Sequence, residues 1–259
     1  LDKYVRQTGM SYQLVPVLNQ TIDADVAYKN MMTKFSFGNA KNPNVYFDEE
    51  NRRHLNSMRL AFSQVAQALA IEGKRDSAQQ LLRKLDAETN EKNFPYGMTS
   101  NRGNQHNYFS YLFLQACYAS GELNLAKKVS VSLLKDLKQG VAYYKLLGEA
   151  MSDDQFFVNV ENAYQGKPNN LGNKQMAFVQ DILTCGQLIE AINKMEKESL
   201  VLLCESLEVL GDTYAIYGFS GKTRNLCEVY KIKDFEEKYD TSVKNRICNI
   251  EAMDYTRMG

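Results

Sequence analysis

The sequence predicts a mainly α protein made of paired helices, followed by a short α/β segment. Apolar residues recur every three or four positions through most of residues 48–196, as on one face of an α-helix. Small residues and a glycine return with the same spacing at 68–78 and 116–126. Two β-rich stretches, at 213–219 and 226–232, follow Gly211. We therefore expect a lead-in at 1–47, a helical domain at 48–196 and an α/β segment at 197–259.

The lead-in is expected to be mostly extended, with one short strand at 12–18. Asp23 or Asp25 can cap a helix that runs to about residue 34, because a carboxylate accepts a hydrogen bond from the free N–H groups of a first turn. Phe35 and Phe37 stand in the loop that follows and are expected to anchor it.

Two pairs of helices come next. The first helix is predicted to begin after Asp48, a favourable N-cap with acidic residues behind it, and to end at Gly73. Further helices are predicted at 75–87, 108–120 and 125–137. Residues 88–104 are rich in Asn, Gly and Pro, which indicates a loop insertion between the pairs.

Beyond residue 140, the pattern predicts helices at 141–151, 152–165, 173–196 and 199–210, with a loop at 166–170. The stretch 213–219 is rich in aromatic and β-favouring residues and predicts a buried strand. A second strand at 226–232 and a helix at 241–250 complete an α/β order that the first two-thirds of the chain lack.

The turns within the two helix pairs share one motif. Each has an alanine, a glycine five positions later and a second alanine five positions after that: Ala68, Gly73, Ala78 and Ala116, Gly121, Ala126. This spacing resembles the core of a tetratricopeptide repeat (TPR), although the copies lie 48 residues apart rather than about 34. The resemblance implies TPR-like helical hairpins in an α-α superhelix, with the helix at 23–34 and those after 141 covering its open faces.

Composition excludes several classes of function. The 31 basic and 31 acidic residues balance, and without a basic block nucleic-acid binding is disfavoured. There is no apolar window long enough to span a membrane. Five cysteines without CxxC spacing favour buried reduced thiols over disulfides or zinc. The missing initiator Met and apolar leader favour a fragment of a longer protein.

The residues that usually carry catalysis are sparse. The chain has two histidines, His54 and His106, and both are expected at the surface or near helix ends. A catalytic dyad of His106 with Cys117 is disfavoured. The acidic clusters at 48–50 and 153–154 fit helix N-termini better than a catalytic carboxylate pair. Residues 218–223 end like a phosphate loop but have Ile216 where that motif needs glycine. We therefore expect no enzymatic activity and no cofactor.

One region suggests a binding role. Residues 108–144 are rich in aromatic side chains, which either pack between helices or line a groove on the concave face of a helical array. In the second case a protein or peptide is the expected partner, and the loop at 101–107 would frame the groove. The candidate groove residues are Tyr108, Tyr111, Tyr118 and Tyr144.

The N-terminal part resembles a known family. Its landmarks are Tyr4–Val17, Asn30–Phe35 and Asn42–Glu49. Across residues 1–196 the chain is similar to the soluble C-terminal region of a Bacteroidetes-type family of multi-span membrane proteins related to protein O-mannosyltransferases. The resemblance implies a TPR-like, extracytoplasmic scaffold beside a membrane glycosyltransferase. That family's active site lies in the membrane part, so no catalytic residue is carried over.

The C-terminal part resembles a different family. Residues 196–259 are similar to part of the von Willebrand factor A domain of nitric-oxide-reductase activation proteins, at Leu207–Asp212, Tyr214–Gly221, Tyr230–Phe235 and Asp254–Gly259. Such domains bind a divalent cation, and Thr256 stands at the position of a metal-binding Thr. The Asp-x-Ser-x-Ser loop of that family is missing, so no working metal site is expected. This resemblance implies a cytoplasmic protein and leaves a metal-dependent activation fragment as the alternative function.

Overall fold

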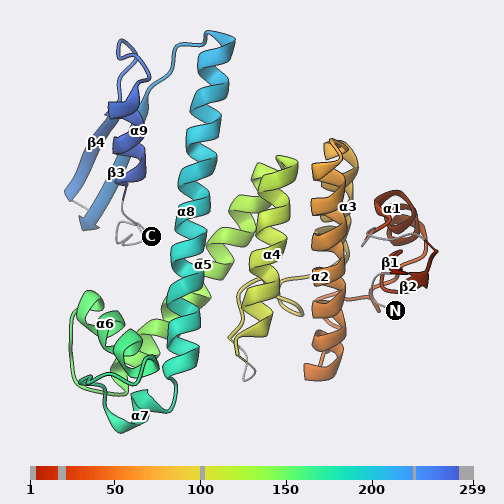
Figure 1. Cartoon of the computed structure of the whole chain (residues 1–259), viewed down its shortest axis with the longest axis horizontal. Helices are drawn as coiled ribbons and strands as arrows, with labels where there is room; N and C mark the ends of the chain where they lie inside the picture. Colours follow the sequence, from red (N-terminus) through yellow and green to blue (C-terminus); the bar gives the residue numbers. More distant parts are fainter. Residues whose placement is uncertain (1–3, 17–21, 100–102, 224–225, 251–259) are drawn as a thin grey trace. The chain divides into compact units, whose positions relative to one another are not determined.

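The computed structural model describes residues 4–16, 22–99, 103–223 and 226–250. In the last two strands, the side chains of residues 219–228 are not described. The structure is mainly helical with a few short strands, as the sequence predicts (Figure 1). It forms two compact units, Leu1–Ile189 and Glu190–Gly259. No helix among the described residues is long and apolar enough to cross a membrane.

The first unit opens with two short strands and one helix. β1 (Val5–Gln7) and β2 (Tyr12–Leu14) pair antiparallel, so the predicted strand at 12–18 is shorter and has a partner. α1 (Ala24–Thr33) is capped by Asp23, which accepts a hydrogen bond of 3.1 Å from the N–H of Val26. Asp23 also forms an ion pair of 2.8 Å with Arg6, so one carboxylate joins β1 to α1.

Four helices form the centre of this unit. They are α2 (Glu49–Ile71), α3 (Arg75–Glu88), α4 (Gln105–Ser120) and α5 (Leu123–Leu146). α2 packs against α3 and α4, and α4 packs against α5. Asp48 caps α2 as predicted, and the predicted anchors Phe35 and Phe37 both place their rings edge-on against the buried Phe62.

The two helical turns have the same geometry. Gly73 and Gly121 each have φ of 79°, in the left-handed region where a side chain is disfavoured. The N–H one residue after each glycine bonds a carbonyl five residues back, Lys74 to Leu69 and Glu122 to Cys117, both at 2.8 Å. The alanines at 78, 116 and 126 are fully buried, which lets the helices approach closely. Ala68 is half-buried.

The helices after residue 137 differ from the prediction. α5 continues through Gly140 to Leu146, and residues 147–152 are not helical. Gly140 is tolerated inside α5 because packing occupies its bare face: an added Cβ would lie 3.7 Å from Thr99 Oγ1 and 3.8 Å from Cys185 Sγ. α6 (Asp153–Tyr164) is capped by Ser152 and has Asp153 and Asp154 in its first turn, as expected.

The predicted helices at 173–196 and 199–210 are divided elsewhere. α7 (Asn173–Met176) ends at a turn over residues 177–178, and α8 (Val179–Leu210) then runs without interruption. Residues 190–200 contain no Gly or Pro and many good helix formers, so nothing in the sequence stops the helix there. The boundary between the units falls inside α8, after Ile189.

The second unit consists of the remainder of α8, a hairpin and one helix. β3 (Ile216–Thr223) and β4 (Leu226–Lys233) pair antiparallel, and α9 (Thr241–Cys248) is capped by Asp240. Its small core centres on Cys204, Val243 and Ile247. The expectation of a buried strand at 213–219 is wrong: the strand is one arm of a two-stranded hairpin, and Tyr217 is exposed because the described residues add no further strand to this sheet.

Candidate interaction surface

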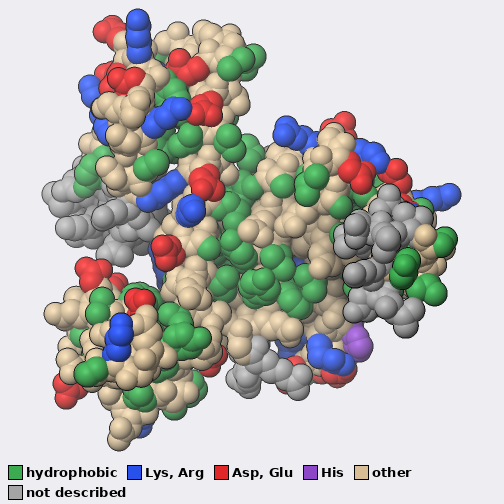
Figure 2. Space-filling view, in the orientation of Figure 1, with side chains coloured by type: hydrophobic (Ala, Val, Ile, Leu, Met, Phe, Trp, Pro, Cys, Tyr) green, Lys and Arg blue, Asp and Glu red, His purple; other side chains and the backbone are tan. Residues whose placement is uncertain are grey.

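Two of the four predicted groove tyrosines lie together on α4. The rings of Tyr108 and Tyr111 are 6.5 Å apart, and Phe109 lies 6.2 Å from Tyr108. Tyr108 is 46% exposed, while Tyr111 is half-buried and its hydroxyl accepts a bond of 3.0 Å from Gln115. Figure 2 shows hydrophobic side chains gathered over α4 on the face in view. The start of α4 therefore presents an aromatic surface to solvent.

The other two tyrosines are placed differently. Tyr118 lies near the C-terminal end of α4 and is half-buried. Tyr144 is on α5, only 6% exposed, with its ring 5.4 Å from Phe178 and 5.5 Å from Tyr143. Burial, reinforced by the nearby Asp181, raises the pKa of Tyr144 to about 12. A groove shared by all four rings stays a prediction, and only the pair of Tyr108 and Tyr111 stands together on one exposed face.

The inner side of α4 is held by a buried arginine that the sequence analysis missed. Arg59 of α2 is 1% exposed and donates to Ser110 Oγ at 2.6 Å. It also donates to the carbonyls of Phe94 and Pro95, at 3.3 and 3.2 Å, and its guanidinium lies 3.7 Å from the centre of the Phe94 ring. Its position four residues after Leu55, on the apolar face of the helix, was the available signal.

His106 belongs to the same cluster, so the prediction of a surface or capping histidine is wrong. It is 3% exposed, and its Nε2 lies 2.7 Å from the Pro95 carbonyl and 3.2 Å from Arg59 Nη1. Burial and the neighbouring positive charge lower the pKa of His106 to about 3, and burial lowers the pKa of Arg59 to about 9. The imidazole is therefore neutral at ordinary pH, and its role is to pack in the interior beside Phe94.

The insertion between the helix pairs is tightly built in. Phe94 and Tyr96 are 1% and 2% exposed, and the Tyr96 hydroxyl donates to Asp86 at 2.7 Å. Gly97 approaches α5 so closely that an added Cβ would lie 2.3 Å from the Ser132 carbonyl oxygen. The N–H of Met98 donates to Asn107 Oδ1 of α4 at 2.8 Å. The loop after α3 is therefore bonded to α4 as well as packed against α5. Of the predicted framing loop at 101–107, residues 101 and 102 lie outside the described residues.

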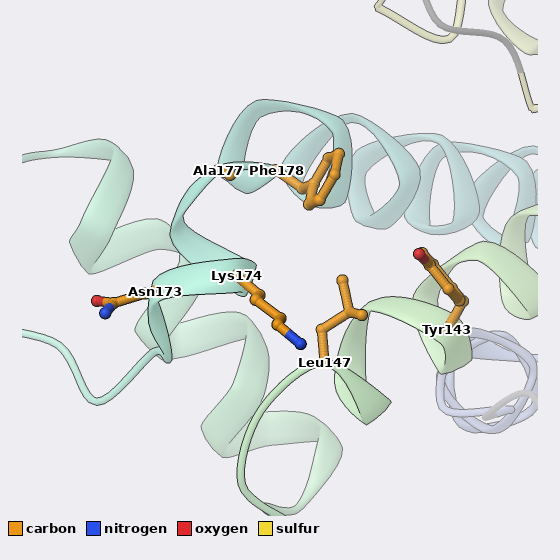
Figure 3. Close-up of a pocket in the computed structure, with 6 residues that line it drawn as sticks. All are labelled: Tyr143, Leu147, Asn173, Lys174, Ala177 and Phe178. Carbon is orange, nitrogen blue, oxygen red and sulfur yellow. The ribbon is translucent and has the colours of Figure 1, made fainter.

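A second candidate site is an open depression of about 510 Å³ at the end of α5 (Figure 3). Its walls come from the last turn of α5 and from α7 with the turn after it. The sequence places Tyr143 within the aromatic-rich stretch 108–144 but gives no sign of the other lining residues, because the end of α5 and the turn after α7 meet only in the fold. The lining residues are Tyr143, Leu147, Asn173, Lys174, Ala177 and Phe178.

The proposed metal position cannot be placed, since Thr256 lies outside the described residues. Among the residues that are described, no three His, Cys, Asp or Glu side chains gather as metal ligands would. Cys117, Cys185 and Cys204 are free and buried, as predicted, whereas Cys248 is exposed. Burial is the main cause that raises the pKa of the Cys185 thiol to about 11, so this sulfur is unreactive at neutral pH.

Comparison with known proteins gives partial matches. The chain is 42% identical over 62 residues to Uncharacterized protein PA0525 of Pseudomonas aeruginosa. It is 35% identical over 65 residues to Protein NorD of Brucella abortus and 37% identical over 62 residues to Protein NorD of Stutzerimonas stutzeri. Each match covers 24% or 25% of this chain and 10% of the relative. The chain matches no protein-family model and no solved structure.

These matches confirm the resemblance to nitric-oxide-reductase activation proteins over about a quarter of the chain. They span a tenth of the relatives' length, so they identify a shared segment and not a shared whole protein. The resemblance of residues 1–196 to the O-mannosyltransferase-related family finds no support in these comparisons. The structure shows a mainly helical chain, and the comparisons show a segment similar to NorD.

Proposed function

We propose that the first unit, Leu1–Ile189, is a non-catalytic protein-interaction module, and that a partner protein contacts the exposed aromatic face of α4. The observation that carries this proposal is the contrast between the two sides of α4. Tyr108 is 46% exposed on one side, while Arg59 and the insertion loop hold the other side rigid. Aromatic anchors on a rigid helix lose little conformational entropy when they bind, and such residues dominate protein interfaces.

Site-specific photo-crosslinking of the full chain tests this function. A photoreactive amino acid replaces Tyr108 in one variant and Tyr46 in a control variant, and both are expressed in the natural host. Tyr46 is also aromatic and, at 83% exposed, more accessible than Tyr108. We expect a defined protein adduct from position 108 that position 46 does not give, and we expect Tyr111→Ala to weaken it. Identical adducts from both positions, or none, would contradict the proposal.

The N-terminal resemblance motivates a finer version of this proposal, in which the module is the extracytoplasmic part of a membrane glycosyltransferase-like protein. Its support is the similarity at Tyr4–Val17 and the next two landmarks. Fractionation of the natural host, with an antibody to the first unit, tests the compartment. Recovery outside the cytoplasm supports this version, and recovery in the cytoplasm favours the second candidate below.

The second candidate is a fragment of a metal-dependent von Willebrand factor A-type activation protein. It is supported by the NorD matches and by the order α8, β3, β4, α9 in the second unit. A Mg²⁺ titration followed by thermal melting tests it, because an ion that binds only the folded state raises the melting temperature by mass action. Thr256→Ala should remove the shift. A melting temperature that does not respond to Mg²⁺ would eliminate this candidate.

A further inference from the structure

A buried side chain behind the depression at the end of α5 holds its walls together. Gln175 of α7 is fully buried and donates to the carbonyls of Tyr144 and Lys145, at 3.2 and 3.3 Å. Its own oxygen accepts a bond of 3.0 Å from the N–H of Gly172. Gly148 leaves the space that this side chain needs, since an added Cβ would lie 2.2 Å from Gln175 Oε1. Gln175 therefore locks α7 onto the last turn of α5 and holds the walls in place.

The walls combine apolar surface with one positive charge. Tyr143 and Phe178 are 56% and 37% exposed, although each packs against the buried Tyr144 ring. Lys174 extends from α7 toward Leu147 in Figure 3. Within the described part of the chain no carboxylate forms an ion pair with Lys174, in contrast to its neighbour Lys145, which pairs with Asp153. The site thus offers an apolar seat and an ammonium group beside it.

We propose that this depression binds a segment of a partner protein in which an aromatic or long aliphatic side chain stands next to an aspartate or glutamate. The apolar side chain packs on Tyr143, Leu147 and Phe178, and the carboxylate pairs with Lys174. The depression is open to solvent, whereas small-molecule sites usually enclose most of their ligand. A protruding side chain of a larger partner suits it better. The proposal rests on the proposed function only in that the partner is a protein.

A tryptophan-containing peptide is a suitable probe, because this chain has no tryptophan and the peptide can be excited selectively. The full chain is titrated against Gly-Glu-Trp-Glu-Gly and, as a charge control, Gly-Lys-Trp-Lys-Gly, with fluorescence anisotropy as the readout. Gly-Glu-Ala-Glu-Gly competes to test the apolar seat. The variants are Lys174→Glu and, as a matched control, Lys167→Glu, which makes the same charge change on an exposed loop residue.

We expect saturable binding of the acidic tryptophan peptide and weaker binding of the basic one. Lys174→Glu should weaken the acidic peptide by about fivefold or more, the scale of an exposed ion pair turned into a repulsion, and Lys167→Glu should leave it nearly unchanged. The alanine peptide should compete poorly. Absence of saturable binding, equal binding of both tryptophan peptides, or equal effects of the two variants would overturn the proposal.

Two further outcomes separate this proposal from its alternatives. If indole-3-acetate displaces the acidic peptide and binds as tightly as the peptide does, the depression is a small-molecule site and the proposal is wrong. If the peptide binds as expected while Tyr108 gives no adduct in the natural host, the α4 surface fails as the interaction face and the α5 depression stands. If the peptide does not bind but position 108 still gives its adduct, the proposal for the depression is wrong and the proposed function of α4 stands.

Discussion

The Arg59 guanidinium and the His106 imidazole meet 3.2 Å apart, both buried, at the contact of α2 with α4. No carboxylate of the described residues forms an ion pair with Arg59. Instead, carbonyl oxygens, a hydroxyl and the faces of Phe94 and Tyr96 surround its charge. Burial first, and then the positive charge of Arg59 beside it, lower the pKa of His106, so the imidazole is kept neutral.

Acid should destabilise the protein through His106. Its pKa is about 3 when folded against 6.5 as the ordinary value, so below about pH 6.5 the unfolded chain binds a proton that the folded chain refuses. The free energy of unfolding should therefore be level above that pH and fall toward pH 3, by up to about 1.4 kcal/mol per pH unit. Urea denaturation at several pH values measures this slope.

The matched variants for this pH dependence are His106→Gln and His54→Gln. His54 lies on the surface, with its side chain 69% exposed, so its replacement should leave the slope unchanged. His106→Gln should flatten the slope between about pH 6.5 and pH 4, because no imidazole is left to protonate. Equal slopes in the two variants would contradict the assignment to His106.

Arg59→Met should lower the free energy of unfolding by about 2–4 kcal/mol, because it leaves the buried Ser110 hydroxyl and the carbonyls of Phe94 and Pro95 short of donors. The comparison is Arg53→Met on the exposed face of the same helix, where the ion pair with Glu50 is in solvent. That variant should leave the free energy of unfolding nearly unchanged, because exposed ion pairs contribute little. Similar losses in both would show that burial of Arg59 contributes nothing.

Gly148→Ala should destabilise the first unit by about 1–3 kcal/mol, since the new methyl group would collide with the buried Gln175. Gly172→Ala is the control, because its Cβ would lie at an ordinary 3.7 Å from Gln175 Oε1. Thermal melting compares the two. If the two variants melt together, Gln175 is not locked in the way that its hydrogen bonds indicate.

Gly73→Ala and Gly121→Ala should cost the same amount, about 1–2 kcal/mol each, since both glycines have φ of 79°. The cost should come from the backbone alone. An added Cβ meets nothing within 4 Å at Gly73 and only Gln79 Nε2, at 3.7 Å, at Gly121. Chemical denaturation of the two single variants measures both values. Clearly unequal losses would show that the two turns are not equivalent.

Local signals predicted most of the helices correctly. Asp23 and Asp48, both named as N-caps from the sequence, each stand before a helix and accept a bond from its first turn. Gly73 and Gly121 end helices where the sequence placed the ends. Such caps act within a few residues, so the sequence alone reveals them. The continuity of α5 through Gly140 was missed, because the packing that tolerates this glycine comes from Thr99 and Cys185, far away in the chain.

The candidate sites were less predictable than the helices. Tyr108 and Tyr111 lie one helical turn apart, so their shared face follows from helical spacing alone. The depression beside Lys174 needs the end of α5 and α7 to meet, which Gln175 brings about across some thirty residues of chain. No local pattern carries that information, and the burial of His106 was mispredicted for the same reason.

The sequence by itself determined the mainly helical class, the matched turns at Gly73 and Gly121 and the segment similar to NorD, because each depends on neighbouring residues or on a continuous match. The tertiary structure alone decided which polar residues are buried. His106 and Gln175 look like surface residues in sequence, and Arg59 is a charged residue on an apolar helix face, yet each lies in the interior. The physical reason is that a buried polar group is tolerated only where distant segments supply its hydrogen bonds, and the fold alone brings those partners within reach.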